Sequence, residues 1–231
     1  MEYFVYKNID SRTVKGLIVT ELPPITKPKM RVQTTTIDGK DGSIVTELGY
    51  EAYTKTVKIA LTRGYDVDNI LAWLNGSGQI TFSNEVDRYY NAQVIDQIDY
   101  EKLLRFKTAE VRFLVQPFKY SVTERMRTFA TTGLSAIEIR NAGNYTAKPL
   151  VTFYGTGLIN VSLNDKQVFK LDLSNDASIT LDCNEQEAYN ANGLRNRKMD
   201  GDFFVFAVGR NVISWSGAVD KIEITNFSRW L

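Results

Sequence analysis

Residues 90–115 read YNAQVIDQIDYEKLLRFKTAEVRFLV. Two long runs in this stretch alternate between apolar and polar side chains, which is the pattern of β-strands with one buried face. The runs meet around Tyr100-Glu101-Lys102, so we expect an extended hairpin that turns there. Most of the remaining sequence alternates in the same way, in short runs separated by Gly, Asn, Asp and Pro. The chain therefore belongs to the mainly β class, with antiparallel sheets.

The alternating runs predict strands in both halves of the chain. In the first half they are residues 2–7, 14–20, 31–37, 52–61, 79–82, 90–100 and 104–115. In the second half they are residues 136–140, 150–154, 158–163, 167–172, 178–182, 203–207, 211–215 and 221–225. Eight short runs with turn residues between them are typical of a β-sandwich or jelly roll.

One stretch, DVDNILAWLNG (66–76), has a helical period instead. Its apolar residues recur at the spacing i, i+3, i+4, i+7, which gives a single stripe made of Val67, Ile70, Leu71 and Leu74. Asp66 is a suitable N-cap, and Asn75-Gly76 supplies a left-handed stop. We expect one short amphipathic helix, at about residues 66–75, lying on a sheet.

The alternation weakens near Pro117, which indicates a domain boundary. The stretch QPFKYSVTERMRTFATTG (116–133) has little periodicity and resembles a linker or a crossing strand. We expect a first β domain with one helix at residues 1–120, a linker at 121–133, and a second β-sandwich at 134–231.

Composition excludes several classes of function. The formal net charge is +1, whereas proteins that bind duplex DNA usually carry a strong basic excess. The chain has no histidine, which removes Ser-His-Asp triads, zinc–histidine sites and histidine pH switches. There is one cysteine, Cys183, and no apolar run of membrane-spanning or signal-peptide length. We expect no cofactor, no metal, no membrane insertion, and synthesis in a reducing cytoplasm.

The loop TTTIDGKDGSI (34–44) has the composition of a metal or phosphate site but not the spacing. Counted from Asp38, the EF-hand ligand positions 3, 5 and 12 are Lys40, Gly42 and Gly49. A phosphate loop needs Gly-Lys followed by Ser or Thr, and here an acid follows. The two Asp-Gly pairs instead predict a turn between strands.

Three other sets of residues leave alternatives open. Acids at Asp87, Asp96, Asp99, Glu110, Asp182 and Glu185 could support glycoside hydrolysis, or lie on solvated faces. Aromatics such as Trp215 could stack on sugars, as in a carbohydrate-binding module that contacts the host cell wall, or belong to the core. The long loop 184–202 carries Arg195, Arg197 and Lys198, which could meet an acidic partner or be solvated.

Taken in order, several motifs resemble those of the distal tail protein (Dit) family of long-tailed, siphovirus-type bacteriophages. They are GKDG (39–42), LNGSGQITFSN (74–84), RYYNAQV (88–94), FLVQPF (113–118), NAGNYTAKPLVTFYGTG (141–157), MDGDFFVFAVGRNVISWSG (199–217) and NFSRWL (226–231). The likeness covers nearly the whole chain. One departure is Ala207-Val208, where a proline often precedes the Gly-x-Asn of the family.

The resemblance implies a structural virion protein rather than an enzyme, located in the tail tip, made in the bacterial host cytoplasm or encoded by a prophage. It implies a homo-hexameric ring built by the N-terminal domain, a DNA channel, and a galectin-like C-terminal sandwich. The implied partners are the tail tube protein, the tail-associated lysin or central fibre, and other baseplate or receptor-binding proteins, with no sequence-specific nucleic acid. Candidate interface residues, placed on turns and loops by this analogy, are Asp38, Lys40, Asp41, Tyr100, Lys102, Arg195, Arg197 and Lys198.

Overall fold

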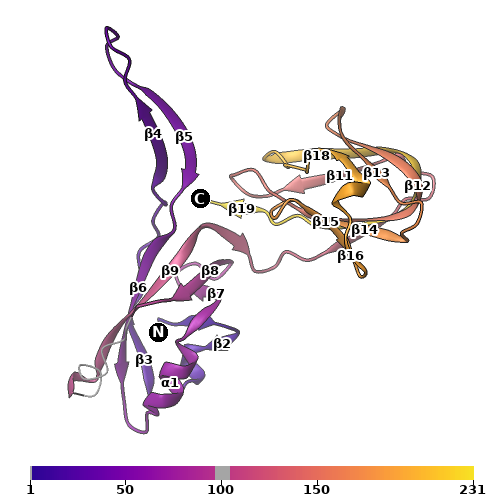
Figure 1. The fold of residues 1–231 in the computed structure, drawn as a ribbon. Helices are drawn as coiled ribbons and strands as arrows, with labels where there is room; N and C mark the ends of the chain where they lie inside the picture. Colours follow the sequence, from indigo (N-terminus) through magenta and orange to yellow (C-terminus); the bar gives the residue numbers. More distant parts are fainter. Residues whose placement is uncertain (1, 97–104) are drawn as a thin grey trace. The chain divides into compact units, whose positions relative to one another are not determined.

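The computed structural model describes residues 2–96 and 105–231, and it separates into two compact units (Figure 1). The first unit runs to Val122 and the second from Thr123 to Trp230. Both are built from antiparallel sheets, so the mainly β, sandwich-type fold class predicted from the sequence is confirmed. Among the described residues, no helix has the length and apolar character needed to cross a membrane.

The first unit contains one large sheet and a separate hairpin. The sheet has the strand order β2-β1-β7-β8-β9-β6-β3, and β4 pairs with β5 alone. The elements are β1 (Phe4–Tyr6), β2 (Ile9–Asp10), the 3-10 turn η1 (Ser11–Thr13), β3 (Leu17–Glu21), β4 (Met30–Thr35), β5 (Ile44–Tyr50), β6 (Tyr53–Leu61), α1 (Val67–Trp73), β7 (Gly76–Phe82), β8 (Arg88–Val94) and β9 (Thr108–Ser121).

Helix α1 forms where its apolar stripe predicts, and it also buries Trp73, which lies outside that stripe. The Asp66 side chain accepts a hydrogen bond from the backbone N–H of Asn69 (3.2 Å), so it caps the first turn. The helix buries Ile70 and Trp73 against the sheet, where the Trp73 ring stacks on Phe4 with a centroid distance of 5.3 Å. The indole N–H donates to the Tyr6 carbonyl oxygen (3.0 Å), which satisfies the only polar atom of that buried ring.

The predicted hairpin at 90–115 is present as the antiparallel pair β8–β9, in which Val94 lies opposite Phe113. Its predicted turn at Tyr100 and Lys102 lies outside the described residues. Strand β9 continues past Pro117 to Ser121, beyond the strand end expected at residue 115. The register with β8 shifts between Tyr90 and Ala92, opposite the segment that holds Pro117, and such a bulge accommodates a residue without an N–H.

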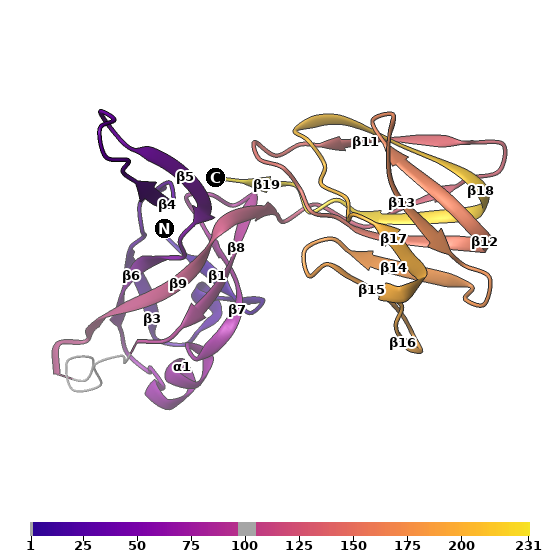
Figure 2. The ribbon, with the colours of Figure 1, turned by 45° about the horizontal axis from the view of Figure 1, so that its top comes forward.

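The second unit is a single sheet that curls around its own core (Figure 2). Its main strand order is β10-β18-β12-β14-β15-β16, with β11 paired to β18, and β13 paired to β12 and β17. The elements are β10 (Arg127–Ala130), β11 (Ala136–Asn141), β12 (Leu150–Leu163), β13 (Lys166–Asp172), β14 (Ser178–Asp182), β15 (Glu187–Asn190), β16 (Gly193–Leu194), η2 (Asn196–Lys198), β17 (Met199–Gly201), β18 (Gly209–Thr225) and β19 (Arg229–Trp230).

Two pairs of predicted short strands are in fact single long strands. Residues 150–154 and 158–163 both lie in β12, and residues 211–215 and 221–225 both lie in β18. The intervening glycines were interpreted as turn residues, but they permit close pairing of the two strands. A Cβ on Gly155 would lie 2.1 Å from the Ala218 carbonyl oxygen, and one on Gly217 would lie 2.7 Å from that of Leu158.

Three further predictions differ from the structure. The range 121–133, expected to be a linker, contains β10, which pairs with β18. The range 203–207, expected to be a strand, holds only a single bridge between Phe206 and Ala147. The loop 184–202 contains β15, β16, η2 and β17. Strand β15 pairs with β14 and β17 pairs with β13, and Asn190 and Lys198 add side-chain bonds to Asp176 and Asp172.

Candidate assembly surface

The β4–β5 hairpin, Met30–Tyr50, extends away from the sheet of the first unit, and we call it the arm (Figure 1). Every residue from Arg31 to Gly49 is exposed. None of these residues belongs to the core of the unit, although an isolated two-stranded hairpin is only marginally stable in water. A surface of this kind is typical of a segment that packs against something outside its own domain.

The tip of the arm is the turn predicted from the sequence. The N–H of Lys40 donates to the carbonyl oxygen of Ile37 (3.1 Å), which closes the turn. Gly39 and Gly42 have φ values of +79° and +80°, in the region that favours glycine. The candidate residues Asp38, Lys40 and Asp41 all lie here and are exposed, so the structure brings these three together.

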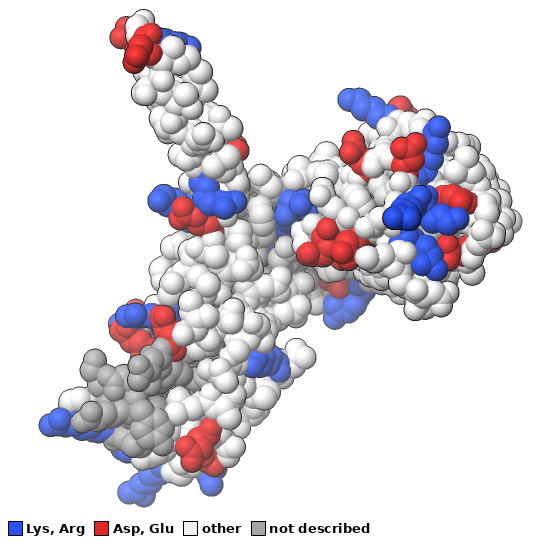
Figure 3. Space-filling view, in the orientation of Figure 1, with Lys and Arg blue, Asp and Glu red and all other residues white. Residues whose placement is uncertain are grey.

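Both faces of the arm carry apolar side chains. Residues opposite each other in an antiparallel pair share a face, so Val32 and Glu47 lie on the same side as Thr34 and Val45. The opposite face carries Ile44. Val45, on the first face, is 56% exposed. Figure 3 shows charged groups near the tip and the root of the arm and an uncharged stem between them. The outer backbone edges of β4 and β5 pair with no other strand of the described chain, so they are open to strand addition.

The root of the arm is held by side chains rather than by a sheet. The segment Leu22–Lys29 (LPPITKPK), which we call the strap, joins β3 to β4 and is rich in prolines. Its carbonyl oxygens accept from side chains of the sheet: Lys55 Nζ donates to Pro24 (2.8 Å), Asn84 to Pro23 (3.0 Å) and the Tyr53 hydroxyl to Thr26 (3.3 Å). These bonds fix where the arm leaves the unit, because the strap has no ladder of its own.

Behind the strap lies a cluster of buried polar groups. Lys55 is 3% exposed, and Lys119 is also buried and forms an ion pair with Glu85 (2.6 Å). The Tyr90 hydroxyl donates to the other oxygen of Glu85 (2.8 Å). Burial lowers the pKa of Lys55 to about 8 and raises the pKa of Tyr90 far above its usual value. Lys119 and Tyr90 bind the Glu85 carboxylate, and Lys55 binds the Pro24 carbonyl oxygen beside them, so the cluster links β6, β8, β9 and the strap.

The sequence analysis did not identify this cluster or the exposure of the arm. Lys55 stands in an alternating run and Lys119 in the stretch of weak periodicity at 116–133, so neither differs in sequence from a surface lysine. Only the pairing of distant strands makes them buried. The proline content of the strap was the one available signal, because a proline-rich connection cannot join the neighbouring ladders.

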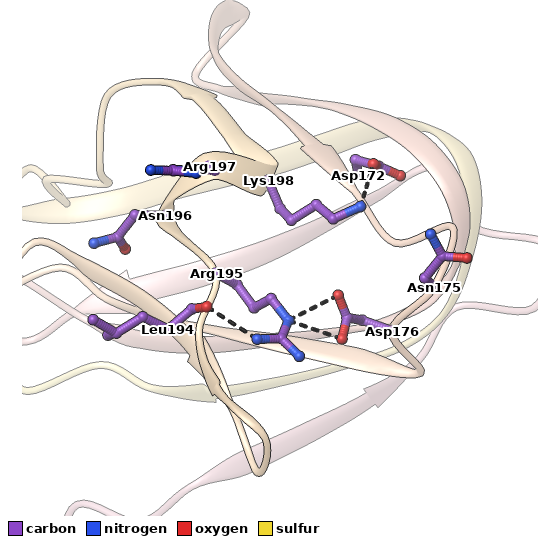
Figure 4. Close-up of a pocket in the computed structure, with 8 residues that line it drawn as sticks. All are labelled: Asp172, Asn175, Asp176, Leu194, Arg195, Asn196, Arg197 and Lys198. Carbon is purple, nitrogen blue, oxygen red and sulfur yellow. Dashed lines mark hydrogen bonds and ion pairs between the residues drawn. The ribbon is translucent and has the colours of Figure 1, made fainter.

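The remaining candidate interface residues do not join the arm tip. Tyr100 and Lys102 lie outside the described residues. Arg195, Arg197 and Lys198 belong to the second unit, where they line a hollow of about 750 Å³ together with Asp172, Asn175, Asp176, Leu194 and Asn196 (Figure 4). The candidate set is therefore split between separate surfaces.

The charges in this hollow are largely paired. Arg195 Nε lies 3.0 and 3.1 Å from the two oxygens of Asp176, and Lys198 Nζ lies 2.7 Å from Asp172. The Lys198 ammonium, with help from the hydroxyl and N–H of Ser174, holds the pKa of Asp172 well below its usual value. Two of the three cations expected to meet an acidic partner are thus already neutralised within the unit.

Other residues considered for chemistry have structural surroundings. Trp215 is only 8% exposed and belongs to the core of the second unit, so it offers no platform for a sugar. Cys183 is buried, and burial raises the pKa of its thiol to about 12, which disfavours the nucleophilic thiolate. Within residues 2–96 and 105–231, no three Cys, Asp or Glu side chains gather as a metal site would require.

Comparisons with known proteins find matches among solved structures. No protein-family model and no curated protein matches the chain. The Dit (gp 19.1) protein of phage SPP1, a paradigm of the hub adsorption apparatus in phages that infect Gram-positive hosts, matches with a TM-score of 0.74 and 16% identity, covering 100% of both chains. A chain of the phage p2 baseplate in its activated conformation matches with a TM-score of 0.52 and 11% identity, covering 96% of this chain and 98% of the other. The fold expected from the resemblance in sequence is thus confirmed: the chain has the fold of the SPP1 Dit protein over its full length.

Proposed function

We propose that this chain is a structural, non-enzymatic protein of a phage tail tip, which forms a homo-hexameric ring between the tail tube and the baseplate. The observation that carries the proposal is the arm, an exposed hairpin with apolar side chains and two open strand edges, on a chain whose whole length has the Dit fold. Such a segment needs a neighbour, and a second copy of the same chain supplies one.

The arm suits a contact that repeats around a ring. A contact between two different surfaces of identical chains is heterologous, and it closes into a ring when the rotation permits. The arm of one subunit would bury its valines and its isoleucine against the next subunit. Its open strand edge would pair with a strand of that subunit. Asp38, Lys40 and Asp41 at the tip then become contacts with the neighbour or with the ring above, and Tyr100 and Lys102 remain candidates for the same interface.

The outer face of the first sheet suits a channel wall. Strands β7, β8 and β9 carry Ser77, Gln79, Asn91, Gln93 and Gln116 on this face, around a hollow of about 390 Å³ without a charged residue in its lining. Phosphate groups bind tightly where lysine and arginine are dense, and amides and hydroxyls hold them weakly. We assign this face to the channel through which DNA passes.

The proposed neighbours in the virion are the tail tube protein above the ring and the tail-associated lysin or central fibre below it. The second unit would dock these or other baseplate and receptor-binding proteins. The alternative function, a carbohydrate-binding module, has less support, because its candidate aromatic Trp215 is buried in the core.

Negative-stain electron microscopy across a concentration series tests the proposal. The full chain should form six-fold rings with a central hole. An arm-less variant, in which Arg31–Gly49 is replaced by Asn-Gly, should stay monomeric. Met30 and Tyr50 lie opposite each other, so a two-residue turn can join them without disturbing the core.

The control is Arg210→Gln, an exposed change in the second unit, which should leave the rings intact. Rings formed equally well by the arm-less variant would contradict the role of the arm. Monomers of the full chain at every concentration would contradict self-assembly into a ring.

A further inference from the structure

The hollow of the second unit is open to solvent and large enough to hold a small ligand. It is formed where the turn after β13 meets the segment that holds β16 and η2, and its volume of about 750 Å³ is within the range of small-molecule sites. We propose that this hollow binds a sugar residue that carries an acidic group, either a carboxylate or a phosphate ester. This site goes beyond the ring-forming function and does not depend on it.

The side chains around the hollow are fixed before any ligand arrives. Asp176 is 5% exposed and accepts from Asn190 (2.6 Å) as well as from Arg195. The guanidinium of Arg195 also donates from Nη1 to the Leu194 carbonyl oxygen (3.0 Å), so three bonds orient it. Figure 4 shows Arg195 and Lys198 reaching across the hollow toward Asp176 and Asp172. Groups that are already ordered lose little entropy on binding, which favours affinity.

Several donors remain for a ligand. Among the described residues, none accepts a hydrogen bond from Nη2 of Arg195, from the amide of Asn175 or from the guanidinium of Arg197. Lys198 uses one of its three protons on Asp172. Three cations face two carboxylates that are already neutralised, so the hollow has a surplus positive charge and more donors than acceptors. It therefore favours a ligand rich in acceptors with a negative charge.

The arrangement favours a sugar over a bare anion. The free donors are spread around the hollow instead of converging on one point, and a phosphate ion would occupy a small part of the volume. Leu194, which is 63% exposed, supplies an apolar wall for the C–H face of a sugar ring. The paired carboxylates can accept from hydroxyls, whereas they would repel an anion placed directly beside them.

Saturation-transfer NMR on the full chain tests this assignment, with glucuronic acid, glucose 6-phosphate and glucose as ligands and inorganic phosphate as competitor. Both acidic sugars should receive saturation from the protein, and glucose should receive less. Arg197→Gln should weaken the binding of the acidic sugars by about tenfold or more, since it removes a charged donor. Arg197 makes no bond that the fold needs, so this variant should stay folded.

Asn175→Ala is the second variant. It should weaken the binding of glucose as well as that of the acidic sugars. The matched control is Arg210→Gln, which removes an exposed guanidinium of the same unit outside the hollow. The proposal is overturned if no sugar receives saturation, or if Arg197→Gln and Arg210→Gln bind alike. It is also overturned if inorganic phosphate binds as tightly as glucose 6-phosphate, because the hollow would then be a site for the anion alone.

Discussion

The hairpin β8–β9 and the arm β4–β5 belong to the same unit and differ in where their apolar side chains go. In β8–β9, Val94 and Phe113 lie opposite each other and are buried. In the arm, Val32 stands between polar residues in a similar way, and both Val32 and Val45 are exposed. The comparison teaches that alternation identifies a strand with an apolar face but does not say whether that face is covered by its own chain.

The largest expected difference between the two hairpins is in stability. Phe113→Ala removes a fully buried ring that packs on Phe4, Tyr6 and Phe82, and should lower the free energy of unfolding by about 3–5 kcal/mol. Urea titration followed by tryptophan fluorescence measures the change. Gln116→Ala, on the outer face of the same strand, is the control and should cost within about 0.5 kcal/mol. Equal losses would mean that the two faces of β9 are not distinct.

A smaller effect is expected from pH at the root of the arm. The pKa of Lys55 is about 8, chiefly through burial, with Glu85 raising it and Lys119 lowering it. Because the unfolded chain holds this proton up to about pH 10.5, burying the charged amine costs stability below pH 8, and the cost is relieved as pH rises. The free energy of unfolding should therefore increase by about 1 kcal/mol between pH 8 and pH 9.

Lys55→Met should abolish this increase, and Lys58→Met, an exposed change in the same strand, should preserve it. The tyrosines do not interfere in this range, because an unfolded tyrosine ionises only near pH 10. Tyr53 and Tyr90, whose folded pKa values are raised above 10, therefore reduce stability only as the pH approaches 10 and beyond. A stability that falls from pH 8 to pH 9 in the unchanged chain would contradict the assignment.

The smallest effect on folding is expected in the arm itself. Val45→Thr keeps the shape and strand preference of the side chain, and should change the free energy of unfolding by less than about 0.5 kcal/mol. The same change at buried Val57 should cost about 1–3 kcal/mol, since it buries a hydroxyl. In sedimentation velocity, Val45→Thr should reduce the ring population even though the monomer stays as stable. Unchanged assembly would mean that this side of the arm is not an interface.

Local chemistry made part of the molecule predictable. The helix at 67–73, its cap at Asp66 and the turn at the arm tip all depend on neighbours in sequence, and each is found where the sequence indicates it. The glycines at 155 and 217 were misread because a turn and a close strand pairing require the same residue. Whether such a glycine marks a turn or a close strand pairing depends on which strand lies opposite it. The local sequence does not contain that information.

The candidate surfaces were predicted less well than the fold. Asp38, Lys40 and Asp41 lie together on the exposed turn, and their place in an interface stays a prediction. Nothing in their spacing shows that the whole hairpin behind them is uncovered. Arg195 and Lys198 were expected either to meet an acidic partner or to be solvated, and the structure pairs them with Asp176 and Asp172 of the same unit. Long-range pairing of charges is set by topology, and so is the burial of Lys55 and Lys119.

The exposure of the arm has a consequence for proteolysis. Arg31 and Lys40 are trypsin sites in an uncovered hairpin, where the backbone needs little local unfolding to enter a protease. A cut there leaves the core of the first unit intact, because no arm residue belongs to it. Trypsin would therefore cut free subunits quickly within the arm and assembled subunits slowly. The cleavage rate would report, even in a crude lysate, which fraction of the subunits is assembled.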